Sequence, residues 1–185
     1  MAGVHEEFAH NWKAEVLRGR PLILPSRHYT YPAVVDEVER GALEVLVTPA
    51  EGMPFLATCA LGFRDPAVPT GVWAMPDAEW LCAVSGGYAY LIDTRAPERF
   101  TQVAWRPVLG VETIPELGLM LFVGHHALLA WDAKGEAWQS DRLSWEGVTL
   151  TGREGNVLHG LGWDLMTDRE TPFSLDLTTG RRVSE

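Results

Sequence analysis

Histidine and aspartate are the residues of this sequence whose types could support catalysis or metal binding. A zinc site on one helix needs two histidines four residues apart, so that both imidazoles lie on the same face. In the opening segment HEEFAH, His5 and His10 are five residues apart. They would lie on different faces of a helix, so this segment predicts no metal site.

Three further histidines could converge on a metal ion or a substrate. His125 and His126 lie at the tip of a predicted hairpin, and His159 follows later in the chain. Adjacent residues of a strand point to opposite faces, which disfavours one metal held by both His125 and His126. We therefore expect turn histidines on the surface and no metal ion, and keep contact with a ligand or partner as the alternative.

Asp93, Asp132 and Asp176 each end a predicted strand and could be interpreted as carboxylates for acid and base catalysis. Each also precedes a turn sequence, DTRAP, DAKGE or DLTTG, in which an aspartate accepts hydrogen bonds from the following backbone. We favour turn capping. No serine lies in a nucleophile-elbow setting, so the sequence predicts no catalytic residue and no cofactor.

Tryptophan is abundant, with eight residues in a chain of 185. Some must pack between sheets, but tryptophan is also favoured where an apolar face with one donor meets a partner or a sugar ring. We take Trp131 and Trp138, together with His125 and His126, as the candidate ligand- or partner-binding residues.

Hydrophobic periodicity indicates which elements must position these residues. Residues 4–18 carry Phe8, Trp12 and Val16 at helical spacing, which predicts an amphipathic helix. A proline-rich connector follows, and from residue 43 short runs rich in Val, Leu, Trp and Tyr alternate with Gly, Pro and Asp turns, which is typical of strands. We expect residues 1–42 to form a helix and connector and residues 43–185 a β domain, within a single folded unit.

The β region also contains an internal repeat at an offset of 39 residues, which aligns Val72 with Val111 and Asp93 with Asp132. Such a period, with several short strands in each unit, is typical of propeller blades. The segments resemble quinoprotein-like and WD-type β-propeller repeats, although Trp131-Asp132 is matched by Ile92-Asp93 and Leu175-Asp176 in the other copies. The resemblance implies an all-β fold with one N-terminal helix, in which about three to four antiparallel blades form a partial or small propeller-like stack.

Composition limits the function classes. The net charge is −10, with no cluster of basic residues, so we expect neither nucleic-acid nor membrane binding. The N-terminus lacks the basic start and apolar core of a signal peptide, and we expect a cytoplasmic protein. Cys59 and Cys82 lie in apolar runs and are expected to be buried free thiols.

Two functions remain open. The absence of a catalytic motif favours a non-enzymatic protein-binding or assembly scaffold, which binds a protein partner or a second copy of itself through blade edges. The alternative is a hydrolase or carbohydrate-binding protein that uses an aromatic-lined pocket with Asp and His.

Overall fold

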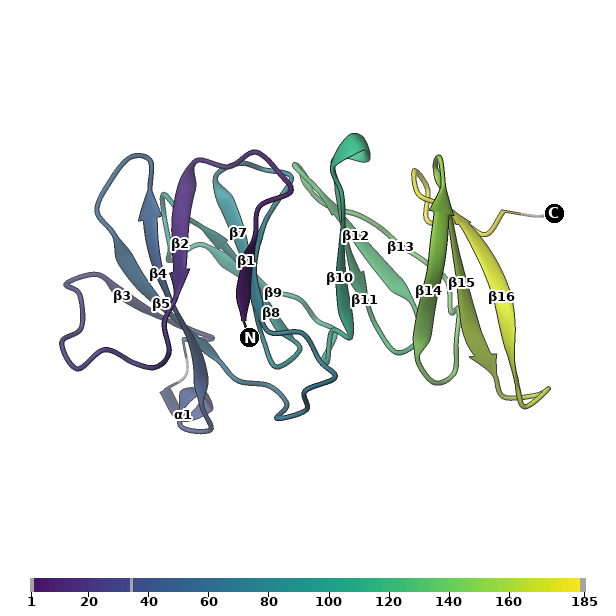
Figure 1. The fold of residues 1–185 in the computed structure, drawn as a ribbon, viewed down its shortest axis with the longest axis horizontal. Coiled ribbons are helices and arrows are strands. Elements are labelled where there is room, and N and C mark those ends of the chain that lie inside the picture. The colour runs from purple at the N-terminus through teal and green to yellow at the C-terminus, as the bar shows by residue number, and fades with distance from the viewer. Residues whose placement is uncertain (1, 34, 184–185) are drawn as a thin grey trace. The chain divides into compact units, whose positions relative to one another are not determined.

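The fold is almost entirely β. The computed structural model describes residues 2–33 and 35–183, and these residues form sixteen strands in four sheets (Figure 1). Their helical content is one turn of α-helix, α1 (Val35–Val38), and one 3-10 turn, η1 (Pro115–Leu117). The chain divides into two compact units, residues 1–108 and 109–185. No helix of the described residues is long and apolar enough to cross a membrane.

Unit 1 contains two sheets. The five-stranded sheet has the order β1-β6-β7-β8-β9 and the four-stranded sheet the order β2-β4-β5-β3. Neighbouring strands are antiparallel, except that β1 runs parallel to β6 and β3 parallel to β5. The strands are β1 (Gly3–His5), β2 (Trp12–Val16), β3 (His28–Tyr31), β4 (Ala42–Pro49), β5 (Phe55–Ala60), β6 (Gly71–Ala74), β7 (Trp80–Ser85), β8 (Tyr88–Asp93) and β9 (Phe100–Gln102).

The helix expected over residues 4–18 is wrong, because that segment forms β1 and β2. The sequence of β2, WKAEV, also alternates apolar and charged residues, and along it Trp12 is buried while Lys13 and Glu15 are exposed. This period of two fits a strand, and β2 pairs with β4 over its whole length. Tertiary pairing therefore overrides the helical spacing of the longer window. The residues of the expected connector also join this sheet, since β3 pairs with β5.

The core of unit 1 is built on central strands that are buried on both faces. All six residues of β5 are buried, and β7 and β8 are buried except for their first residues. Cys59 on β5 and Cys82 on β7 are free thiols inside this core, as the sequence predicted. Burial raises the pKa of both thiols far above the usual value.

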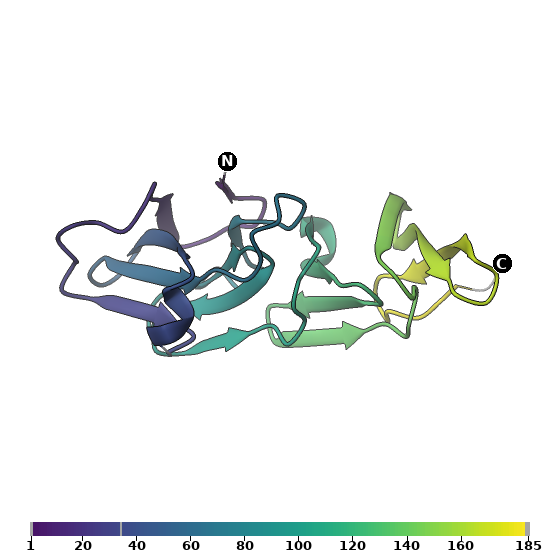
Figure 2. The same ribbon diagram turned by 90° about the horizontal axis from the view of Figure 1, so that it is seen from below.

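Unit 2 also contains two sheets, in the orders β10-β11-β12-β13 and β14-β15-β16, with every neighbouring pair antiparallel. Their strands follow one another in chain order, which Figures 1 and 2 show as consecutive hairpins. The strands are β10 (Gly110–Ile114), β11 (Leu119–Val123), β12 (Leu128–Asp132), β13 (Gly135–Gln139), β14 (Val148–Glu154), β15 (Val157–Asp164) and β16 (Arg169–Asp176).

One apolar cluster joins the two sheets of unit 2. Leu121 and Leu128 come from the first sheet, and Leu158, Phe173 and Leu175 from the second. The second sheet is buried on one face only, because buried and half-buried residues alternate along β15. A β-sheet with one apolar face needs such a partner to bury that face.

The strands of two sheets begin at a constant offset. Gly71 of β6 and Gly110 of β10 are 39 residues apart, as are Trp80 of β7 and Leu119 of β11. Each unit contributes two separate sheets of the described residues, and neither unit by itself forms a closed propeller.

Candidate functional site

The two candidate tryptophans lie on neighbouring strands but on opposite faces of their sheet. Trp138 on β13 is opposite Ala130, whereas Trp131 on β12 is opposite Glu136, and adjacent residues of a strand point to opposite faces. Trp138 packs against the apolar cluster of unit 2, and its indole nitrogen donates to the carbonyl oxygen of Leu177 at 2.8 Å. These contacts give Trp138 a structural role, and Trp131 is half-buried.

The candidate histidines lie in the exposed turn between β11 and β12. The imidazole rings of His125 and His126 are 6.1 Å apart and inclined by 47°. Nδ1 of His126 lies 3.2 Å from the carbonyl oxygen of Ser144, and its own carbonyl accepts hydrogen bonds from the amides of Leu143 and Ser144. His159 instead lies 2.9 Å from the hydroxyl of Ser174. In residues 2–33 and 35–183, no group of three His, Cys, Asp or Glu side chains is arranged to hold a metal ion.

The three repeated aspartates are turn residues, as predicted. The carboxylate of Asp93 accepts the amides of Arg95 and Ala96 and pairs with the guanidinium of Arg99. Asp132 accepts the amides of Lys134 and Gly135, and Asp176 that of Thr178. Asp164, which the sequence reading missed, caps a turn in the same way, through Met166 and Thr167.

A small hollow of about 160 Å³ combines tryptophans with arginines in unit 2. Its lining includes Trp145, Trp163, Asp164 and Arg182, and the guanidinium carbon of Arg142 lies 4.3 Å from the centre of the Trp145 ring. Arg142 therefore covers a face on which a sugar ring would stack, and Asp164 is committed to its turn. The hollow has aromatic and acidic residues but lacks a free carboxylate pair for hydrolysis.

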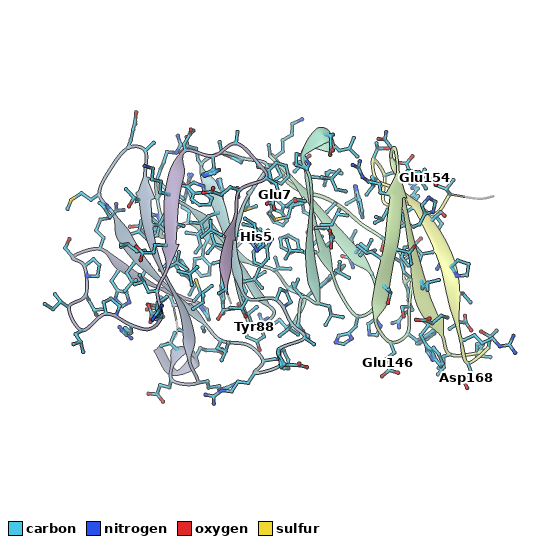
Figure 3. The ribbon with its side chains drawn as sticks, viewed as in Figure 1. His5, Glu7, Tyr88, Glu146, Glu154 and Asp168 are labelled. Carbon is cyan, nitrogen blue, oxygen red and sulfur yellow. The ribbon has the colours of Figure 1, made fainter. Side chains whose placement is uncertain are left out.

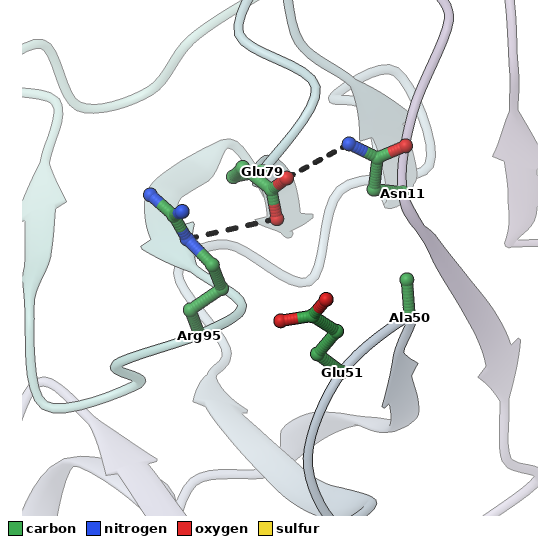
Figure 4. A pocket seen from close by; sticks show the side chains of 5 residues that line it. All are labelled: Asn11, Ala50, Glu51, Glu79 and Arg95. Carbon is green, nitrogen blue, oxygen red and sulfur yellow. Dashed lines mark hydrogen bonds and ion pairs between the residues drawn. The ribbon is translucent and has the colours of Figure 1, made fainter.

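A second hollow, of about 360 Å³, lies in unit 1 and is lined by charged and polar residues (Figure 4). Glu79 accepts a hydrogen bond of 2.8 Å from the amide of Asn11 and forms an ion pair of 3.7 Å with Arg95. The carboxylate of Glu51 also points toward the hollow in Figure 4. Because Glu79 already has two partners, this arrangement is that of a surface polar network.

A third hollow, of about 350 Å³, runs between the two sheets of unit 2 and is here called the β14 groove. One wall comes from β10 and β11 and the other from β14 and β15. The residues that line it are Glu112, Thr113, Ile114, Leu121, Leu150, Thr151, Gly152, Arg153 and Leu158.

The β14 groove has an aliphatic floor and charged ends. Its floor belongs to the apolar cluster of unit 2, through Ile114, Leu121 and Leu158. At one end, Arg153 forms an ion pair of 3.4 Å with Glu116. Although Glu112 is exposed as a residue, partial shielding of its carboxyl group from water raises the pKa of that group. An aliphatic floor with a few polar groups is what a binding site offers.

The β14 groove was not predicted from the sequence. The alternation of Val148, Leu150 and polar residues in VTLTGRE could have indicated a strand with one apolar face. It could not have indicated that Glu112, 36 residues before Val148, lies on the opposite wall.

Comparisons with known proteins identify no family. No family model and no curated protein sequence matches the chain. Among solved structures, it is similar to Kuenenia stuttgartiensis hydrazine synthase, with a TM-score of 0.29, 14% sequence identity, and 67% of this chain covered. The match spans 50% of that chain. With so low a TM-score, this similarity supports no argument about function.

Proposed function

We propose that this protein is a non-enzymatic, protein-binding scaffold, which docks on another protein or on a second copy of itself. The observation that carries the proposal is an exposed apolar loop in unit 1. Leu22 and Ile23, between β2 and β3, are 104% and 88% exposed, and Leu24 follows them at 40%. Three consecutive large apolar side chains in water are unfavourable unless a partner covers them.

The surroundings of this loop also suit a protein surface. Arg18 and Arg20 precede it and are exposed. Arg27 follows the loop just before β3. Its guanidinium donates a hydrogen bond of 3.0 Å to the carbonyl oxygen of Met53 and lies over the ring of Tyr29, which anchors the end of the loop. An apolar centre with a polar rim, and an enrichment of arginine over the whole contact, are common features of protein interfaces.

We also propose that β6–β9 and β10–β13 are repeated, propeller-like blades. This is supported by the spacing of their first two strands, which begin 39 residues later in the second sheet than in the first.

The two buried free cysteines support a reducing compartment such as the cytoplasm. The alternative, a hydrolase or carbohydrate-binding protein, is less well supported, because Arg142 covers Trp145 in the aromatic hollow.

Site-specific photocrosslinking in the native host tests the scaffold proposal. A benzophenone amino acid at position 23 is expected to give one discrete adduct, identified by mass spectrometry as a second copy or as another protein. Binding of the purified partner should then weaken by at least about tenfold when Leu22, Ile23 and Leu24 are replaced by serine.

The matched control carries the same probe at exposed Glu136, on β13 of unit 2. No adduct at position 23 above that of the control would overturn the proposal. An adduct whose partner binds the triple serine variant as tightly as the wild type would do the same.

A further inference from the structure

We propose that the β14 groove binds an extended segment of a partner protein, which adds as a strand to the free edge of β14 and carries an aliphatic residue with Lys or Arg two positions away. This inference rests on the protein-binding function proposed above and specifies a partner chemistry for a different surface of the chain.

The free edge of β14 provides the main-chain part of the site. β14 is the terminal strand of its sheet and pairs only with β15. The backbone groups on its other side are therefore open to another strand, as in recognition by β-strand addition. Its sequence from Val148 to Thr151 contains no proline or charged residue, which are common protections of an exposed edge.

A bulge then limits how far an added strand could pair. Thr151 has no partner on β15, because Leu150 is opposite Gly160 and Gly152 is opposite His159. The extra residue disrupts the ladder locally and bends the strand. The open, regular part of the edge is therefore its first half. Figure 3 labels Glu154 at the other end of the strand.

The floor of the groove provides a pocket for one side chain of the added strand. Leu150 of β14 is opposite Gly160, on the face of the sheet that also carries Leu158. Leu121 and Ile114 form the other wall, from β11 and β10. The ring of Phe173 packs over Gly160 and closes that part of the floor. An aliphatic side chain of the added strand would therefore contact Leu150 and Leu158 on one wall and Leu121 and Ile114 on the other.

Glu112 provides the charge that selects the partner. It is opposite Leu121 in the β10–β11 pair, so it lies on the same face as the groove floor. Across residues 2–33 and 35–183, no hydrogen bond or ion pair engages its carboxylate, whereas Arg153 at the other end of the groove is paired with Glu116. A cationic side chain two positions from the aliphatic one lies on the same face of an added strand and suits Glu112.

The negative net charge of the chain also favours a basic partner segment in the β14 groove. The net charge of −10 favours the approach of a basic segment. A small apolar ligand would fill the floor but leave the free edge of β14 and the carboxylate of Glu112 without partners. An extended, basic-aliphatic segment satisfies all three features.

Fluorescence anisotropy with a labelled peptide tests this proposal on the full chain. The probe is TKTLTKT, acetylated and amidated, in which two lysines flank a leucine on one face, and the comparison peptide is TETLTET. We expect TKTLTKT to bind about tenfold more tightly. Glu112→Gln should weaken its binding about threefold, and Glu112→Lys should reverse the preference between the two peptides.

Two peptides with N-methylated backbones distinguish strand addition from simple charge attraction. One is methylated at the odd positions and the other at the even positions, because alternate amides of a strand point to opposite sides. Only one of the two should lose binding. The control protein variant is Glu136→Gln on exposed β13, which should bind as the wild type does.

Equal binding of the two methylated peptides would overturn the proposal, as would unchanged binding to Glu112→Gln. Absence of binding by TKTLTKT up to about 1 mM would also overturn it. These outcomes are independent of the crosslinking at position 23, so failure of the groove and failure of the scaffold function are distinguishable.

Discussion

The indole nitrogen of Trp138 on β13 donates a hydrogen bond of 2.8 Å to the carbonyl oxygen of Leu177, in the turn after β16. This bond joins the two sheets of unit 2 at a point where both residues also contact the apolar cluster. It also shows why a tryptophan selected as a candidate binding residue has a structural role.

Replacing Trp138 by phenylalanine should lower the free energy of unfolding of the protein by about 1–3 kcal/mol, because the carbonyl of the buried Leu177 loses its donor. Urea denaturation monitored by circular dichroism measures the change. Trp145→Phe is the matched control, since Trp145 is exposed and no hydrogen bond of its indole nitrogen is found in the described part of the chain. Equal loss in both variants would contradict the role assigned to this bond.

Gly180 should tolerate no side chain. Its φ of +69° is costly for other residues, and a Cβ atom at this position would collide with the ring of Trp138. Gly180→Ala should therefore destabilise the protein by about 1–3 kcal/mol in the same assay. Gly152→Ala, where φ is ordinary and open space surrounds the site, serves as the control and should cost less. A neutral Gly180→Ala would show that the turn is less constrained than described.

Thr58 should stabilise unit 1 through a buried carboxylate. Its hydroxyl donates to Glu44 at 2.6 Å and lies 3.2 Å from Nε2 of His28, and both Thr58 and Glu44 are buried. Thr58→Val removes the donor and should lower the free energy of unfolding by about 2 kcal/mol, whereas Thr58→Ser, which keeps the hydroxyl, should cost less. Chemical denaturation of the three proteins decides this, and a valine variant as stable as the serine variant would contradict it.

Asp164 and Asp176 should make the protein less stable in acid. Hydrogen bonds from Thr167 and from Thr178 hold the pKa of these two carboxyl groups below the ordinary value of 3.8. The stabilisation is present above the unfolded-state pKa and is lost as the pH falls through the lowered folded-state pKa. The double variant Asp164→Asn and Asp176→Asn should lose part of this dependence below about pH 4, measured as melting temperature against pH. An unchanged slope would contradict the assignment.

The two thiols should be inert in the folded protein. Cys59 and Cys82 are completely buried, and burial raises their pKa, so little reactive thiolate is present at neutral pH. A chromogenic disulfide reagent should label neither thiol in buffer and both in denaturant. Rapid labelling of the native protein would show that the core of unit 1 opens easily.

The sequence predicted the β character and the turn chemistry better than the structure of the N-terminal segment, residues 4–18. Asp93 and Asp132 were predictable as turn caps because each determinant lies within three residues. The segment around Trp12 was not, because its short alternation competes with a longer helical spacing, and only pairing with β4 decides between them. The β14 groove depends on non-local register and on one bulge, which local patterns do not specify.

The parallel pairing of β1 with β6 has a consequence for biosynthesis. Gly3 lies opposite Gly71, so the edge of that sheet closes only after the intervening residues have left the ribosome. Contacts between residues so distant in sequence form slowly, because a long loop must close first. During translation, β1 is thus a strand without its partner, and until β6 has emerged it is open to mispairing or to recognition by a chaperone.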